Sequence, residues 1–133
     1  MIVLDTHVAL WIMIDPNSLG RRTRKMVSSA LAEHQATISA VSFWELSLLL
    51  AKGRLRSVQS VVRLRDDLLQ IGLIEVPLSG EIAILAAELE NLHGDPADRF
   101  IAATAIAADA TLMTADERLL RWRHPLRRQN AEL

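Results

Sequence analysis

The chain has 133 residues, half of them hydrophobic, and a formal net charge of −1 at pH 7. This length suits one compact domain, and the hydrophobic fraction excludes an intrinsically disordered chain. Because the chain has no cysteine, a disulfide scaffold, a thiolate metal site and a cysteine nucleophile are excluded. The near-neutral charge does not by itself indicate a nucleic-acid-binding protein.

Short apolar runs alternate with stretches of helical periodicity along the chain. The runs predict strands at residues 2–4, 37–41, 73–76 and 111–114. The periodic stretches predict helices at residues 5–14, 18–33, 42–52, 57–71, 79–92, 96–108 and 117–123. This alternation indicates a parallel sheet covered by helices on both faces, in one domain at residues 1–124. Residues 125–133 lose clear periodicity, and we expect a loose C-terminal tail there.

Neither a membrane segment nor a secretion signal is expected. No uncharged apolar stretch approaches the roughly 20 residues that span a bilayer. The apolar run after Met1 has no basic leader and is interrupted by Asp5. We therefore expect a cytoplasmic protein.

Four acidic residues lie next to the ends of predicted strands or in the first turn of predicted helices: Asp5, Glu45, Asp98 and Asp116. In a parallel sheet, ligands bind beyond the carboxyl ends of the strands, and we expect the four side chains to meet there. Two carboxylates about 4 Å apart repel by about 4 kcal/mol at an effective dielectric of about 20. Such a cluster needs protons or a divalent cation, and oxygen ligands favour Mg²⁺ or Mn²⁺. These ions enable a bound water to hydrolyse a phosphodiester.

Each of these acids also has a structural interpretation. Asp5 and Asp116 are favoured N-cap residues. Glu45 fits the S-x-x-E capping box with Ser42, and Asp98 suits the first turn of a helix. Capping and metal binding both place a carboxylate at a helix N-terminus, so the two interpretations are compatible.

Four segments surround these acids: Leu4-Asp5-Thr6-His7, Ser42-Phe43-Trp44-Glu45, His93-Gly94-Asp95-Pro96-Ala97-Asp98-Arg99 and Thr114-Ala115-Asp116. In order and spacing they resemble the PIN-domain ribonucleases, in particular bacterial toxins of the VapC kind. The resemblance implies a three-layer α/β/α sandwich with a central parallel sheet. It also implies an endoribonuclease that depends on Mg²⁺ or Mn²⁺, with RNA as its substrate.

The resemblance also assigns residues and partners. The acidic quartet of the family falls on Asp5, Glu45, Asp98 and Asp116, and its supporting hydroxyl positions match Thr6 and Thr114. The family's toxins are commonly homodimers, neutralised by a small VapB-like antitoxin that also binds DNA. The chain departs from the family at its end, where a closing strand is common and this sequence is rich in arginine.

Several residues near the acids have two interpretations each. Asp95 precedes Pro96, which is typical of an N-cap, and we assign it to capping. Arg99 is expected to contact a phosphate, to orient a carboxylate or to form a plain salt bridge. Basic residues of the second predicted helix are candidates for RNA contact or for a solvated face: Arg21, Arg22, Arg24 and Lys25. The arginines at positions 118–128 have the same two interpretations. The nearby aromatic rings are candidates for RNA contact or for structural roles: His7, Trp11, Trp44 and His93.

Two other function classes remain open at this point. A PIN-like module could bind RNA or a partner without cutting, and weak Mn²⁺ affinity would distinguish it. An aspartate-based phosphotransfer domain also places an Asp after its first strand. The sequence Asp5-Thr6-His7 lacks the second Asp of the dehalogenase type, and no lysine follows a late strand as a receiver would need.

Overall fold

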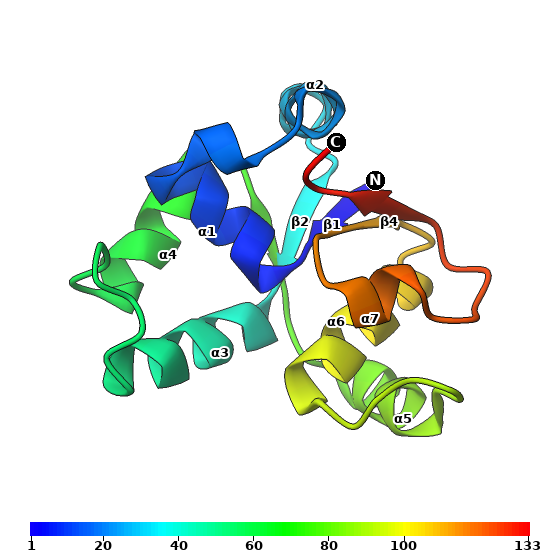
Figure 1. The fold of residues 1–133 in the computed structure, drawn as a ribbon. Helices are drawn as coiled ribbons and strands as arrows, with labels where there is room; N and C mark the ends of the chain where they lie inside the picture. Colours follow the sequence, from blue (N-terminus) through cyan, green and yellow to red (C-terminus); the bar gives the residue numbers. More distant parts are fainter.

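Five parallel strands form the central sheet of the computed structural model, which describes residues 1–133 (Figure 1). The strands are β1 (Ile2–Leu4), β2 (Ala36–Ser39), β3 (Ile74–Val76), β4 (Thr111–Thr114) and β5 (Arg128–Asn130). Their spatial order is β3-β2-β1-β4-β5, so the strand that comes first in the chain lies at the centre. Residue Leu4 pairs with Ile38 on one side and with Met113 on the other. The carboxyl ends of β1, β2 and β4 therefore lie side by side.

Helices cover both faces of the sheet, which confirms the three-layer α/β/α sandwich (Figure 1). They are α1 (Thr6–Ile14), the short 3-10 helix η1 (Pro16–Ser18), α2 (Arg21–Ala32), α3 (Ala40–Ala51), α4 (Val61–Gln70), α5 (Gly80–Glu88), α6 (Pro96–Ala107) and α7 (Glu117–Leu120). None of them is long and apolar enough to cross a lipid bilayer.

Side-chain alternation along β1 divides the hydrophobic core between the two faces. Ile2 and Leu4 belong to the larger cluster, together with apolar residues of α1, α2, α3 and α4. Val3 belongs to the second cluster, together with residues of α6, β4 and α7. All three side chains of the strand are buried. A strand that is apolar at every position is what a sheet covered on both faces requires.

The boundary between β2 and α3 differs from the prediction. The strand ends at Ser39, whose side chain accepts a hydrogen bond from the Val41 N–H (3.1 Å) and caps α3. Ser42 therefore lies inside the helix, and the expected capping box between Ser42 and Glu45 is wrong. Since Ser39 satisfies an N-terminal donor of α3 first, Glu45 is not needed as a cap.

The expectation of a loose C-terminal tail is also wrong, because residues 128–130 form β5 at one edge of the sheet. Leu112 pairs with Arg128 and Thr114 with Asn130. Gln129 and Ala131 are buried. The sequence shows no strand periodicity here because β5 is short and polar. The strand is held instead by pairing with β4 and by the hydrogen bonds of Arg128. The Arg128 guanidinium donates to the carbonyl oxygens of four residues: Leu119, Trp122, His124 and Leu126.

Candidate metal centre

One pocket of about 420 Å³ lies at the carboxyl ends of the central strands. Carboxylates dominate its lining: Asp5, Glu45, Asp95, Asp98, Asp116 and Glu132. Against these six acids stands one guanidinium, that of Arg118. The structure thus brings together all four of the acids that the sequence predicted to meet. We call this hollow the acidic pocket.

Asp5 follows β1 directly and is held from two sides. Its Oδ1 accepts a hydrogen bond from the Thr6 N–H (2.8 Å), which caps α1. Its Oδ2 accepts a hydrogen bond from the hydroxyl of Thr114 at the end of β4 (2.6 Å). Burial raises the pKa of Asp5, although the bonds from Thr114 and Thr6 oppose this shift. The carboxylate is therefore fixed in orientation but costly to keep ionised.

Asp98 lies in the first turn of α6 and is buried. Its Oδ2 lies 2.7 Å from His93 Nε2 and 3.4 Å from a guanidinium nitrogen of Arg118. Its Oδ1 makes no hydrogen bond with the protein and remains free for another partner. Burial raises the pKa of Asp98 to about 6, against the opposing effect of the His93 hydrogen bond. This value of about 6 already includes the charges of Asp5, Asp95 and Asp116, which also raise the pKa of Asp98.

Asp116 caps α7 and is the acid with the strongest compensation. Its Oδ1 accepts hydrogen bonds from the N–H groups of Arg118 (2.8 Å) and Leu119 (3.3 Å). Its Oδ2 lies 3.3 Å from the Arg118 guanidinium. Burial acts to raise the pKa of Asp116, but these hydrogen bonds outweigh it and the net pKa is lowered. Asp116 therefore stays ionised more easily than its neighbours.

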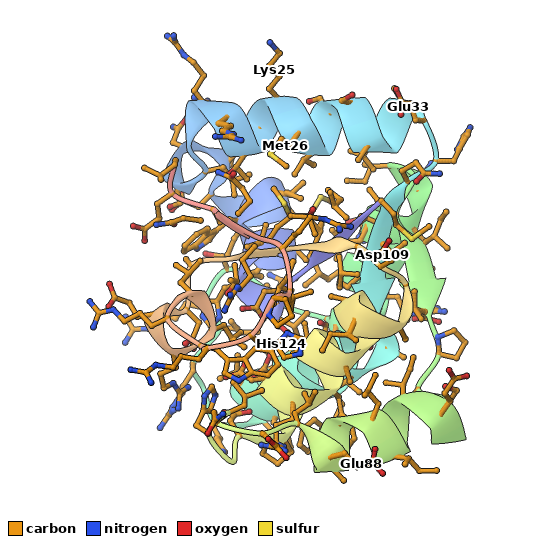
Figure 2. The ribbon with its side chains drawn as sticks, turned by 90° about the vertical axis from the view of Figure 1, so that its right-hand side faces the viewer. Lys25, Met26, Glu33, Glu88, Asp109 and His124 are labelled. Carbon is orange, nitrogen blue, oxygen red and sulfur yellow. The ribbon has the colours of Figure 1, made fainter.

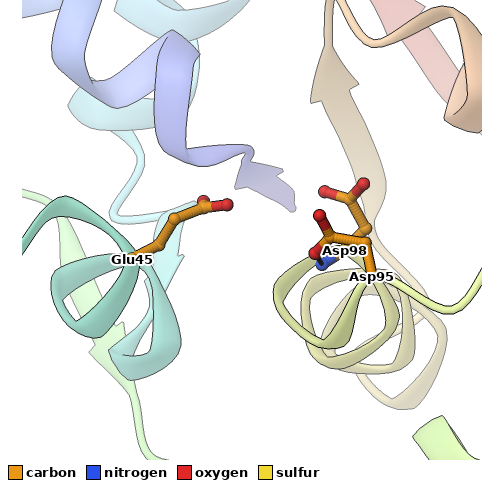
Figure 3. Close-up of side chains that lie close together, drawn as sticks. All are labelled: Glu45, Asp95 and Asp98. Atoms are coloured by element: carbon orange, nitrogen blue, oxygen red, sulfur yellow. Dashed lines mark hydrogen bonds between the residues drawn. The ribbon is translucent and has the colours of Figure 1, made fainter. Parts of the chain in front are cut away.

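Glu45 faces the start of α6 across the pocket. Figure 3 shows it extending from α3 toward Asp95 and Asp98, with the end of β1 between the two helices. One carboxylate oxygen from each of these three residues lies within 4.8 Å of the other two. Burial raises the pKa of Glu45, and the nearby charges of Asp5 and Asp95 add to the shift. This triplet includes Asp95, which the sequence had assigned to capping alone.

Asp95 caps α6 and also lines the acidic pocket. The prediction that it caps α6 is confirmed, because its Oδ1 accepts a hydrogen bond from the Asp98 N–H (3.3 Å). The sequence pattern around Asp95 predicts only the cap and gives no sign that this residue reaches the site. Its place within the triplet shows that a cap at this end of the sheet also lies on the pocket.

The two threonines expected to support the site lie on opposite sides of Asp5. Thr114 bonds directly to the carboxylate, as described above. Thr6 donates its hydroxyl hydrogen to the Ser42 hydroxyl (2.9 Å), which links the start of α1 to α3. Its proximity also acts to lower the pKa of Glu45.

Arg99 does not take any of its expected roles. Its guanidinium turns away from the acids and donates to main-chain carbonyl oxygens of five residues: Ala86, Ala87, Leu89, Leu92 and His93. The cause lies in the early end of α5 at Glu88, where the prediction had the helix continuing to residue 92. The last carbonyl groups of a helix have no hydrogen-bond partner within the helix and need other donors. Arg99 supplies these donors at the end of α5.

The basic residues of α2 are not brought to the acids either. None of the four expected RNA contacts, Arg21, Arg22, Arg24 and Lys25, lines the acidic pocket. Arg22 and Lys25 line a different groove with Met1 and Gln35, at the amino-terminal ends of β1 and β2. Figure 2 shows Lys25 projecting from the outer side of α2.

The four aromatic candidates divide between the pocket and its surroundings. Trp11 and His7 line the acidic pocket, with their rings edge to face at 6.4 Å between centroids. Trp44 lies on the exposed side of α3 with 51% of its surface accessible. His93 is the carboxylate partner described above, so a merely superficial position is excluded for it.

Arg118 and Glu132 are the pocket residues that the sequence analysis did not single out. Arg118 follows Asp116 by two residues, and an arginine so close to a site acid is a signal that could have been used. Glu132 reaches the pocket only because β5 closes the sheet. No local pattern in the sequence indicates that contact.

Comparison with known proteins identifies the fold family. A model described as the PIN domain matches residues 2–124 of this chain. The chain belongs to the PIN domain family. It is 34% identical over 127 residues to Ribonuclease VapC22 of Mycobacterium tuberculosis, and the alignment covers 93% of each chain.

Solved structures share the PIN fold over most of the chain. VapBC2 from Rickettsia felis, bound to a DNA fragment from its promoter, has a TM-score of 0.69 at 22% identity, covering 97% of this chain and 98% of that chain. FitAcB from Neisseria gonorrhoeae has a TM-score of 0.62 at 25% identity, covering 87% of this chain and 88% of that chain. These relatives place the acidic pocket in a fold known from toxin–antitoxin complexes.

The residues of the pocket fit a hard divalent cation. Its donors are carboxylate oxygens, which such ions prefer. The burial that raises the pKa of Asp5, Glu45 and Asp98 would be offset by a doubly positive ion among them. No lysine lines the pocket, which agrees with the argument against a receiver-type phosphotransfer site.

Proposed function

We propose that this PIN domain is a divalent-metal-dependent endoribonuclease, the toxin of a toxin–antitoxin pair. The observation that carries the proposal is the acidic pocket, in which four predicted acids and Asp95 converge with a single guanidinium. The identity with Ribonuclease VapC22 supports RNA as the substrate class. Of the cations that oxygen ligands favour, we propose Mg²⁺ or Mn²⁺.

The catalytic and metal-binding roles fall on Asp5, Glu45, Asp98 and Asp116. Hydrogen bonds from Thr114 and Thr6 orient Asp5, and His93 holds one oxygen of Asp98 so that Oδ1 is presented to the pocket. When bound, the ion stabilises negative charge on the scissile phosphate and lowers the pKa of a water. Glu45, across the pocket from Asp98, is placed to orient that water.

A small antitoxin is the proposed protein partner. The similar solved structures include VapBC from Salmonella typhimurium bound to DNA, with a TM-score of 0.69 at 16% identity, covering 96% of each chain. A DNA-bound complex of this kind supports a protein partner for this chain and a complex that binds DNA. The homodimer implied by the family resemblance stays a prediction.

Cleavage of total RNA by the purified protein tests the proposal. With Mn²⁺, we expect RNA fragments that disappear on addition of EDTA. Asp5→Asn and Asp98→Asn should each reduce the cleavage rate by at least about 100-fold, because each removes a charge that holds the ion.

Asp66→Asn serves as the matched control, since Asp66 is an exposed carboxylate of α4 outside the pocket. This variant should cleave at the wild-type rate. Cleavage that persists in EDTA or in Asp5→Asn would exclude the mechanism. Strong Mn²⁺ binding without cleavage would instead favour a non-catalytic PIN module.

A further inference from the structure

A second hollow, of about 460 Å³, lies beside the acidic pocket. It is lined by Asn91, His93, Arg118, Arg121, Trp122 and Arg123, and we call it the basic hollow. Arg118 lines both hollows. His93 joins them as well, because it lines the basic hollow while its Nε2 contacts Asp98 at 2.7 Å. The two hollows therefore adjoin at these two side chains.

Of the three arginines of the basic hollow, Arg118 pairs with Asp98 and Asp116, whereas Arg121 and Arg123 are free to bind a ligand. Arg121 is 81% exposed, and its one ion pair joins it to Glu117, which is 71% exposed. Such exposed pairs hold their partners weakly. Arg123 is also exposed and makes no ion pair or side-chain hydrogen bond. Arg99 and Arg128 differ, since carbonyl oxygens already occupy their guanidinium groups. No carboxylate lines the basic hollow.

The acidic pocket alone repels a polyanion. A phosphodiester can approach six carboxylates only if cations hold the phosphates on either side of it. Arg121 and Arg123 supply such cations next to the pocket, whereas Arg22 and Lys25 line a groove near the amino-terminal ends of the strands. We propose that the basic hollow holds the RNA backbone beside the scissile phosphate. This inference rests on the proposed function and locates its substrate.

The tryptophan of the hollow, Trp122, does not serve for base stacking. Trp122 is only 4% exposed, its ring stacks on His124 at 4.3 Å, and its indole N–H donates to the Glu90 carbonyl. Recognition in the hollow therefore rests on phosphate charge. Binding of this kind is steeply dependent on salt and tolerant of base sequence.

The test compares two double variants that remove the same charge. One is Arg121→Gln with Arg123→Gln in the basic hollow, and the other is Arg22→Gln with Lys25→Gln on α2. The probe is a fluorescein-labelled single-stranded RNA of mixed sequence, titrated in EDTA at several KCl concentrations and followed by fluorescence anisotropy. EDTA removes divalent ions, so RNA binding is measured without cleavage.

The hollow variant should weaken RNA binding by at least about ten-fold at low salt. Its slope of log K against log salt should become shallower by about 1.4, which corresponds to two lost phosphate contacts on a single strand. The α2 variant should change the Kd less than about two-fold. Equal losses in both variants, or no loss in either, would overturn the inference.

The outcome also separates this inference from the proposed function. If the wild-type protein cleaves no RNA but only the hollow variant loses binding, the nuclease proposal fails and the binding surface stands. If cleavage depends on Mn²⁺ but the hollow variant keeps its KM, the nuclease stands and the surface is wrong. In the supporting case, KM rises in the hollow variant while kcat stays near the wild-type value.

Discussion

The molecule contains two kinds of partly buried charge, and they are arranged in opposite ways. Arg99 and Arg128 are surrounded by carbonyl oxygens that belong to the chain itself, five around the first and four around the second. The carboxylates of the acidic pocket instead face one another. Although every buried side-chain nitrogen and oxygen has a hydrogen-bond partner, the pocket keeps a net negative charge.

The difference shows which charges hold the fold and which serve a ligand. A guanidinium with all its donors engaged stabilises the chain segments around it. Clustered acids with raised pKa values destabilise the ligand-free protein and indicate a functional site. The fold thus uses arginine to fix its irregular segments and retains uncompensated acids where a cation is to bind.

Arg99→Met gives the largest expected effect on stability. Methionine keeps much of the side-chain volume but leaves the carbonyls around the end of α5 without donors. We expect the free energy of unfolding in urea to fall by about 3 kcal/mol. Arg121→Met, an exposed arginine on the same protein, should change it by less than about 0.5 kcal/mol. Equal losses of unfolding free energy in the two variants would show that Arg99 stabilises the fold no more than an exposed arginine does.

Gly20→Ala tests the other end of the segment that Arg128 anchors. The Gly20 N–H donates to the Ala131 carbonyl (2.9 Å), and an added Cβ would lie 2.0 Å from the Leu133 carbonyl carbon. Since the main chain must move, we expect a loss of about 2 kcal/mol on thermal or urea unfolding. Gly94→Ala is the control, because nothing lies within 4 Å of its added Cβ. A loss as large in Gly94→Ala would show that the close contact is not the cause.

The sequence predicted the fold class and the meeting of four acids because both depend on local patterns. Strands of apolar residues and helix starts with acidic residues are visible without the structure, and topology then places them at one edge. β5 was missed because its residues are polar, so only pairing with β4 and the Arg128 contacts define it. The role of Arg99 was missed because it depends on where α5 ends, which no residue in the helix signals.

The site was predictable in its acids but not in its cations. Arg118 was treated only as one of several arginines near the C-terminus, since its contacts with Asp98 and Asp116 depend on the orientation of α7. The basic residues of α2 are as densely charged in sequence as the C-terminal arginines, but none of them lines the acidic pocket. Surface charge has little influence on folding, so its position relative to a site must come from the structure.

The pH dependence of stability tests the contrast between the clustered acids and the two engaged arginines, and its expected effect is the smallest. The pKa of Asp98 in the folded protein is about 6, above its ordinary value of 3.8. The folded state therefore holds more protons than the unfolded state between these values, and stability falls as the pH rises through this window. We expect the metal-free protein to lose on the order of 1 kcal/mol there.

Asp98→Asn should remove most of this pH dependence and make the metal-free protein at least as stable as the wild type at neutral pH. The measurement is the urea unfolding free energy at several pH values in EDTA. Asp66→Asn, an exposed carboxylate of α4, is the control and should keep the wild-type profile. Adding Mn²⁺ should stabilise the wild type increasingly above pH 6, because the ion binds the ionised carboxylate. A wild-type protein whose stability rises through the same window would show that these acids are already compensated, like the two arginines.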